Sequence, residues 1–201
     1  MNEDGTELYK ELYYKEMERK EQINARVQIP LGLIVVLISG IFYCANSMHQ
    51  VPESGRIAFL FFLSVSLISL FVAIFFINKC IFRNKFGYFP LPSEIKTYQD
   101  SLYEHYQKIK EKCDVDAETY VNQKISKFLI ESYIIGTDNN IRTNDSRTKF
   151  LQKSSLAVSA SVIFLVISFC FFIPDLLAGK EPTQKIEIIN DKIQIEDTQL
   201  K

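Results

Sequence analysis

The sequence predicts an all-α membrane protein with three transmembrane helices, because three long apolar stretches occupy 27–45, 57–77 and 154–174. The middle stretch, Ile57 to Ile77, contains no charged residue, proline or glycine. At about 1.5 Å per residue, a helix of that length matches the roughly 30 Å hydrocarbon core of a bilayer. The polar segments around these spans add an N-terminal amphipathic helix, a cytosolic αα-hairpin and a short C-terminal β-hairpin.

The composition excludes several classes of function. The 201 residues carry a formal net charge of -1, so the chain lacks the basic excess of nucleic-acid-binding proteins, and we expect no nucleic-acid partner. The four cysteines and two histidines are scattered, which argues against a disulfide framework or a metal site. No cofactor is expected.

Residues 1–26 predict a cytosolic amphipathic helix, since Tyr9, Leu12, Tyr13 and Met17 recur at helical spacing on one face. That face either packs on the protein's own soluble part or forms a coupling helix on the membrane or in an oligomer collar. Pro30, at the entrance of the first span, predicts a bend that is either a hinge or a turn at the interface.

Residues 27–82 form a predicted transmembrane hairpin, because the connection 46–55 between the first two spans is short and polar. Lys79, Arg83 and Lys85 follow the second span, whereas Arg56, just before that span, is the only Lys or Arg between the first two spans. By the positive-inside rule the N-terminus is cytoplasmic, and three spans place the C-terminus outside a bacterial inner membrane.

Residues 83–153 form a predicted cytosolic helical module. Two apolar helical stripes separated by a turn at 113–116 predict an αα-hairpin, and Gly136 is predicted to cap the end of its second helix. The stripes need a partner, either the N-terminal helix or another copy of the chain. Beyond the third span, 154–174, the extracytoplasmic tail 175–201 predicts a short β-hairpin that needs a partner surface, or a disordered segment.

A polar cluster precedes the third span. Asn140, Asn144 and Arg147 follow one another at i, i+4 and i+7, so in a helix they share a face. One interpretation is a solvated juxtamembrane helix. The other is a polar lock against the N-terminal helix, with Arg147 bridging to a carboxylate such as Glu18 or Glu21.

Small residues predict where the spans pack against one another or against other copies. Such residues let membrane helices approach closely, and a serine hydroxyl can bond to a backbone carbonyl. The candidates for helix packing or oligomerisation are Ser64, Ser66, Ser69, Ala73, Ala157 and Ser161.

The chain shows no recognisable catalytic motif, and we expect no enzyme. The central parts of the spans hold no ionisable side chain, which argues against proton relays and ion-coupled transporters. The acidic group Asp114, Asp116 and Glu118 either complements the dipole of the following helix or ligates a cation. One functional hypothesis is a membrane enzyme, whose activity would require these carboxylates.

The order of segments resembles small, uncharacterised three-span bacterial membrane proteins. The resemblance is carried by LYKELYYKEMERKEQINAR running into IPLGL, by YFPLPSEIKTYQDSLYEHY, and by NNIRTNDSRTKFLQKSSL before the last span. Some membrane proteins of this size and layout act as effectors or sensors in antiviral (anti-phage) defence and disrupt the inner membrane when triggered. The resemblance implies such a role and assigns no site residues.

Two further hypotheses come from different classes. The first is a self-associating effector or sensor whose cytosolic helices receive a signal, from a protein partner or a small signalling ligand, and whose spans then form a pore. The second is a non-conducting anchor or sensor subunit that holds a partner protein at the membrane.

Overall fold

The structure is a computed structural model that describes residues 3–82, 84–112, 114–171 and 173. These residues are helical apart from short connections, and they include no strand. The elements are α1 (Glu3–Asn46), η1 (Met48–Gln50), α2 (Glu53–Ile81), α3 (Pro92–Ile109), η2 (Lys110–Lys112) and α4 (Ala117–Cys170). Helices α1, α2 and α4 are long and apolar enough to cross a membrane, which confirms the three predicted spans. The predicted β-hairpin lies outside the described residues.

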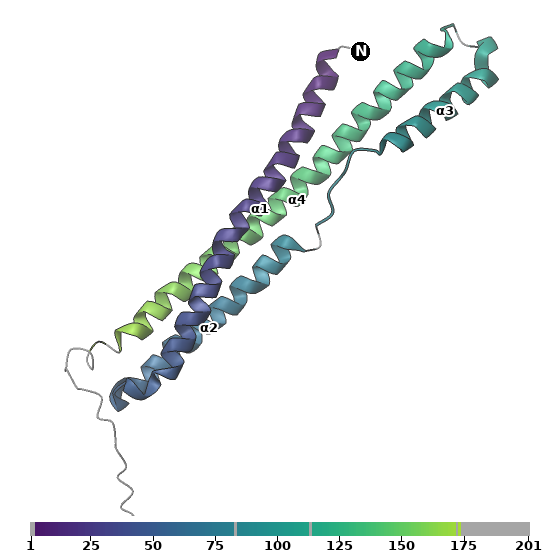
Figure 1. Cartoon of the computed structure of the whole chain (residues 1–201). Coiled ribbons are helices and arrows are strands. Elements are labelled where there is room, and N and C mark those ends of the chain that lie inside the picture. The colour runs from purple at the N-terminus through teal and green to yellow at the C-terminus, as the bar shows by residue number, and fades with distance from the viewer. Residues whose placement is uncertain (1–2, 83, 113, 172, 174–201) are drawn as a thin grey trace, which may run out of the picture.

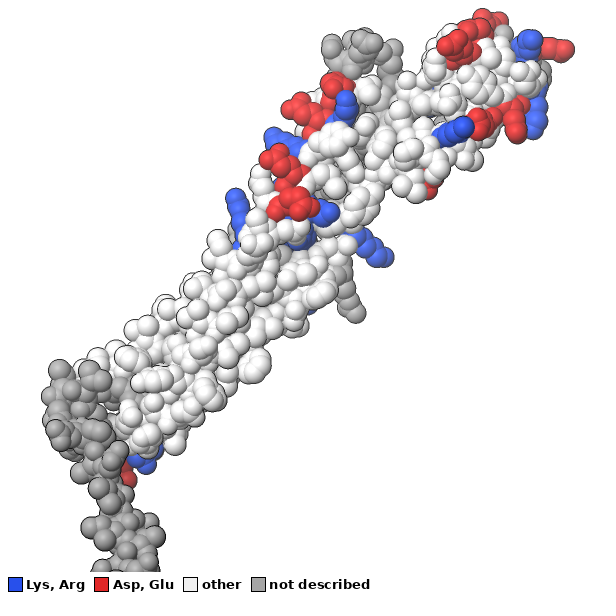
Figure 2. Space-filling model, viewed as in Figure 1, with Lys and Arg blue, Asp and Glu red and all other residues white. Residues whose placement is uncertain are grey.

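Helix α4 is the centre of the arrangement. It packs against both α1 and α2, which touch each other much less. Helices α1 and α4 run in the same direction and α2 runs the opposite way (Figure 1). Helix α3 lies beside the first part of α4, where the Tyr98 and Phe128 rings are 4.7 Å apart. On the face shown in Figure 2, charged side chains gather at the end that holds α3, and the surface over the spans is almost free of them.

Two helices continue across the predicted boundaries between soluble segments and spans. Helix α1 runs through residues 26 and 27 and contains Pro30, which is buried, while α4 runs through residues 153 and 154. Because proline has no N–H, it leaves one intrahelical hydrogen bond unmade. The hinge at Pro30 stays a prediction.

The predicted helix end at Gly136 is wrong, because α4 passes through this residue without interruption. Gly136 lies against the backbone of Gly87, in the connection between α2 and α3. A Cβ built on Gly87 would be 2.8 Å from Gly136 Cα, closer than real Cβ contacts allow. Glycine is therefore required at Gly87 for a close approach of two backbones, and Gly136 is its contact surface rather than a helix cap.

The buried residues of the three long helices follow the same spacing. They alternate in steps of three and four, a seven-residue repeat that lets each helix present one continuous seam to its neighbours. The seams run through Ile23, Val27, Pro30, Ile34, Leu37, Ile41 and Cys44 in α1, through Phe59, Leu63, Ser66, Leu70, Ala73, Ile77 and Cys80 in α2, and through Asn140, Asn144, Arg147, Leu151, Ser154, Val158 and Ser161 in α4.

The outward faces of the spans remain strongly apolar. Val36, Phe71 and Ile163, one from each long helix, are 67%, 64% and 58% exposed. Contiguous apolar surface on this scale is unfavourable in water and favourable in lipid. The packing of the bundle therefore agrees with a membrane environment.

Candidate functional site

The three polar residues predicted to share a face of α4 are buried together. Asn140 and Asn144 are 0% exposed and Arg147 is 3% exposed. They occupy successive seam positions where α4 meets α1 and the end of α2. This burial favours the polar lock over a solvated juxtamembrane helix. We use "polar lock" below for these three residues and their hydrogen-bond partners Glu16, Asn24, Cys80 and Gly87.

Arg147 joins α4 to both neighbouring helices. Its Nε donates to the backbone oxygen of Cys80 at 3.0 Å, and its Nη2 donates to Oδ1 of Asn24 at 2.5 Å. Cys80 lies in the last turn of α2, where backbone carbonyls lack helical partners and the helix dipole is negative. Arg147 therefore acts as a cationic cap for the C-terminus of α2.

The predicted bridge from Arg147 to Glu18 or Glu21 is wrong. Among the described residues, no carboxylate lies within ion-pair distance of the guanidinium. Asn24 lies between Arg147 and Glu21 instead. Its Oδ1 accepts from Arg147, and its side-chain nitrogen donates to Oε2 of Glu21 at 3.1 Å. The Nη1 of Arg147 is buried without a hydrogen-bond partner, and the Phe86 ring lies 5.6 Å from the guanidinium carbon.

Asn144 binds α1 at a single residue. Its Nδ2 donates to the backbone oxygen of Glu16 at 2.9 Å and to the Glu16 carboxylate at 3.0 Å. One turn further along α1, Arg19 contacts Asp145 at 2.7 Å, and this hydrogen bond raises the pKa of Arg19. Amide and ion-pair contacts together fix α1 beside α4 in register.

Asn140 holds the connection between α2 and α3. Its Oδ1 accepts from the Gly87 N–H at 2.8 Å and its Nδ2 donates to the Gly87 carbonyl at 3.1 Å, so one side-chain amide satisfies both backbone groups of that residue. Thr143 and Asn139 add hydrogen bonds to the carbonyl of Lys85, at 3.0 and 3.1 Å. The connection is therefore bound along α4.

An aromatic cluster adjoins Asn140. The Phe89 ring stacks on Tyr133 with centroids 4.4 Å apart, and Tyr13 lies 5.6 Å from Tyr133. The Tyr13 hydroxyl accepts a hydrogen bond from the Phe89 N–H at 3.0 Å. Of the stripe predicted on the N-terminal helix, Tyr13 is buried and Met17 half-buried, whereas Tyr9 and Leu12 are exposed.

Below the polar lock, α2 and α4 are joined by serine hydrogen bonds at seven-residue intervals. Ser154 Oγ donates to the Ala73 carbonyl at 3.1 Å. Ser161 lies seven residues after Ser154 in α4, and Ser66 lies seven residues before Ala73 in the antiparallel α2. Ser66 and Ser161 each donate to the other's carbonyl, at 2.9 and 3.0 Å. Arg147 and Cys80 form the preceding step of the same series.

The other predicted packing residues differ in burial. Ala73 and Ser66 are fully buried, Ser69 and Ala157 are half-buried, and Ser64 is exposed on the outer face of α2. Sequence reasoning did not identify Ser154, Asn24, Glu16 or Gly87 as contributors. Arg147, Ser154 and Ser161 are seven residues apart, and this spacing in the sequence would have indicated that Ser154 lies on the same helix face as the other two.

Replacing Ser161 with alanine is expected to destabilise the bundle by about 0.5–1.5 kcal/mol, because interhelical hydrogen bonds in membranes are typically worth that much. Thermal unfolding of the full chain in a mild detergent measures the change. Ser64→Ala is the matched control and should leave the transition unchanged, since Ser64 faces outward. Equal shifts for the two variants would contradict the assigned seam.

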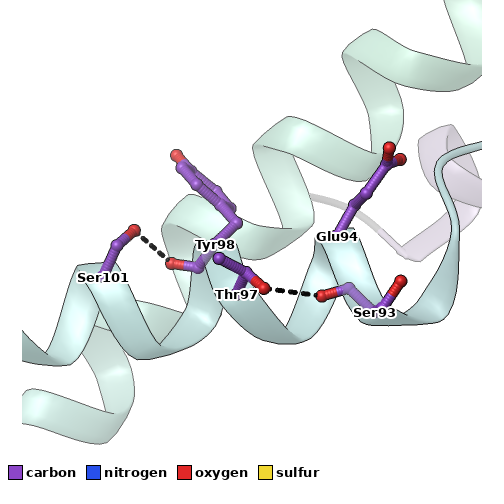
Figure 3. A pocket seen from close by; sticks show the side chains of 5 residues that line it. All are labelled: Ser93, Glu94, Thr97, Tyr98 and Ser101. Atoms are coloured by element: carbon purple, nitrogen blue, oxygen red, sulfur yellow. Dashed lines mark hydrogen bonds between the residues drawn. The ribbon is translucent and has the colours of Figure 1, made fainter.

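A second polar surface lies on α3, where two of the hydroxyl groups bond to the backbone of their own helix. Ser93, Glu94, Thr97, Tyr98 and Ser101 line an open hollow of about 440 Å³ (Figure 3). The Thr97 hydroxyl donates to the Ser93 carbonyl at 2.9 Å, and the Ser101 hydroxyl donates to the Tyr98 carbonyl at 2.7 Å. Because these hydroxyls bond to their own helix, the hollow does not present a converging set of ligands.

The described residues contain no group of three or more histidine, cysteine, aspartate or glutamate side chains that could hold a metal ion. Asp116 immediately precedes α4 and Glu118 lies in its first turn, positions in which carboxylates complement the helix dipole. The polar lock and the buried serines Ser66, Ser154 and Ser161 bond one helix to another or to the connection between α2 and α3. These contacts hold the helices together.

In the described residues, the fold and the site define a helical membrane protein in which three long helices, packed by a seven-residue repeat, are joined by a buried polar lock. Comparisons with protein-family models, with curated proteins and with solved structures found no match to this chain. The function must therefore be argued from the molecule itself.

Proposed function

We propose that this chain is a self-associating sensor or effector of a bacterial inner membrane, in which a soluble helical arm passes a signal to the spans through the polar lock. The arm comprises residues 3–26 of α1, helix α3 and residues 117–139 of α4. The observation that carries the proposal is continuity: α1 and α4 each run unbroken from the arm into the apolar bundle. Displacing the arm must therefore either move the spans or break the hydrogen bonds of the polar lock.

Exposed apolar side chains on the arm support self-association. Leu8, Leu12 and Tyr14 are 53%, 40% and 58% exposed, in a part of α1 that is otherwise rich in charge. Leu8 and Leu12 lie one turn apart on the same face of α1, and contiguous exposed apolar surface marks contact sites. A second copy of the chain is the proposed occupant, and a protein partner or a small signalling ligand would supply the signal.

The composition of the seams supports a rearrangement that permeabilises the membrane. In the closed bundle, Arg147, Ser154 and Ser161 bond to α2, and the lipid-facing surface is apolar. Separating α2 from α4 would free these polar groups, which an assembly of several copies could turn toward water. Together with the resemblance of the segment order, this supports a role in antiviral defence.

Asn140→Ala tests the proposal, because it removes both hydrogen bonds that hold Gly87 to α4. Expression of this variant in bacterial cells should depolarise the membrane at a lower protein level than the wild type does, as measured with a potential-sensitive dye. Arg142→Ala is the matched control, since Arg142 is exposed on the same helix. It should behave as the wild type.

If neither the wild type nor Asn140→Ala changes the membrane potential at equal amounts in the membrane, permeabilisation is to be dropped. The second candidate, a non-conducting anchor or sensor subunit, is favoured by the same exposed side chains at Leu8, Leu12 and Tyr14. Crosslinking distinguishes the two functions. A stable complex with another protein and no contact between copies would favour the anchor.

The proposed orientation has a cytoplasmic N-terminus and an extracytoplasmic C-terminus. It is supported by Lys79, Lys85 and Lys153, which flank the spans at the end that carries the arm. A C-terminal reporter active only in the cytoplasm should be silent, and the same reporter at the N-terminus should be active. Activity at both ends would contradict the odd number of spans.

A further inference from the structure

The groove between α2 and α4 at the edge of the apolar bundle combines an apolar lining with a cation. It has a volume of about 430 Å³ and is lined by Phe75, Phe82 and Phe150 together with Asn78, Lys79 and Ser146. Lys79 lies in the last turn of α2. The groove therefore lies at the level where charged side chains begin.

Two lysines extend across this part of the bundle, each toward a phenylalanine of the other helix. Lys79 Nζ on α2 is 5.7 Å from the centre of the Phe150 ring on α4, and it also lies 4.8 Å from Phe75. Lys153 on α4 lies beside the groove rather than in its lining, and its Nζ is 5.6 Å from the Phe76 ring on α2. Between them the Phe76 and Phe150 rings stack with centroids 6.3 Å apart.

Neither ammonium group forms an ion pair with a carboxylate in the described part of the chain. A lysine at the end of a span keeps its charge at the interface while its methylene stem covers apolar surface. At that depth the abundant counter-charge is the phosphate of a lipid, and basic pockets between transmembrane helices suit anionic headgroups.

We propose that this groove binds an anionic glycerophospholipid, with the headgroup phosphate at Lys79 and Lys153 and an acyl chain along Phe75 and Phe150. The charge favours an anionic over a zwitterionic headgroup, and the phenylalanines favour a lipid over a free phosphate. A lipid held here would bridge α2 and α4 beside the contact between Arg147 and Cys80 in the polar lock. The inference requires only that the spans lie in a membrane, and it does not rest on the proposed signalling role.

The test measures lipid binding to the full chain, purified in a neutral detergent, by native mass spectrometry. Dioleoylphosphatidylglycerol and dioleoylphosphatidylcholine are compared because they share acyl chains and differ in headgroup charge. Lys79→Gln/Lys153→Gln should weaken phosphatidylglycerol binding by about tenfold, the size expected when lysine contacts to a lipid phosphate are lost. Binding of phosphatidylcholine should hardly change.

Arg26→Gln/Lys124→Gln is the charge-matched control. It removes two positive charges, Arg26 on α1 and Lys124 on the arm, from residues that neither line the groove nor lie over Phe75, Phe76 or Phe150. This control should retain phosphatidylglycerol binding. Lys79→Arg/Lys153→Arg keeps both charges at the changed positions and should also retain binding, which distinguishes a loss of charge from misfolding. Equal affinity of the wild type for the two lipids, or an equal loss in the control, would overturn the proposal.

Discussion

Arg147→Ala is expected to destabilise the chain by about 3 kcal/mol, because hydrogen bonds to a charged group are typically worth about 1.5–3 kcal/mol each and the variant loses two. It removes the donor to Asn24 and the cationic cap on the Cys80 carbonyl. The wild type already carries the cost of burying Nη1 of Arg147 without a partner. The expected loss of stability is therefore smaller than the sum of the two hydrogen-bond contributions. Thermal unfolding in a mild detergent should show a midpoint lower by about 6–12 °C.

Arg147→Lys separates charge from geometry. A lysine ammonium cannot reproduce the planar fork that contacts Cys80 and Asn24 together, so we expect it to recover at most about half of the lost stability. Arg142→Ala, which changes an exposed arginine on the same helix, should shift the free energy of unfolding by less than about 0.5 kcal/mol. Full recovery with lysine would show that the charge alone matters.

Gly87→Ala is expected to destabilise the chain by about 2 kcal/mol, the usual range for forcing an extra carbon into a packed site. The added Cβ would meet the backbone of Gly136, which cannot swing aside as a flexible side chain can. The connection would lift from α4 and weaken both Asn140 hydrogen bonds. The midpoint of thermal unfolding in detergent should fall by about 4–8 °C.

Gly32→Ala is the matched control for this substitution. Gly32 lies inside α1, and a Cβ there would meet nothing within 4 Å. Because alanine favours a helix more than glycine does, this variant should be neutral or more stable by about 0.5–1 kcal/mol. A loss of stability at Gly32 similar to that at Gly87 would contradict the steric explanation.

The spans were predictable because hydrophobic length is a local property. The stretch Ile57 to Ile77 can be recognised without knowing its neighbours, and so can the start of α4 at Ala117, after the predicted turn. The shared face of Asn140, Asn144 and Arg147 was predictable for the same reason, since it follows from helical spacing alone.

The errors arose where a neighbouring segment overrides a local rule. A glycine after an apolar stripe usually ends a helix, but Gly136 continues α4 because Gly87 packs against it. Glu18 and Glu21 were natural partners for Arg147 by charge. Asn24 took their place because the parallel register of α1 and α4 brings its side chain to the guanidinium.

By itself, the sequence determined that three helices of this chain are long and apolar enough to cross a membrane, and that one of them carries a polar face before its span. Only the tertiary structure decided that α4 is central, that Arg147 caps α2, and that Ser66 pairs with Ser161. The physical reason is that hydrophobicity acts on each helix separately. Buried hydrogen bonds depend on which donors and acceptors a particular register brings within about 3 Å of one another.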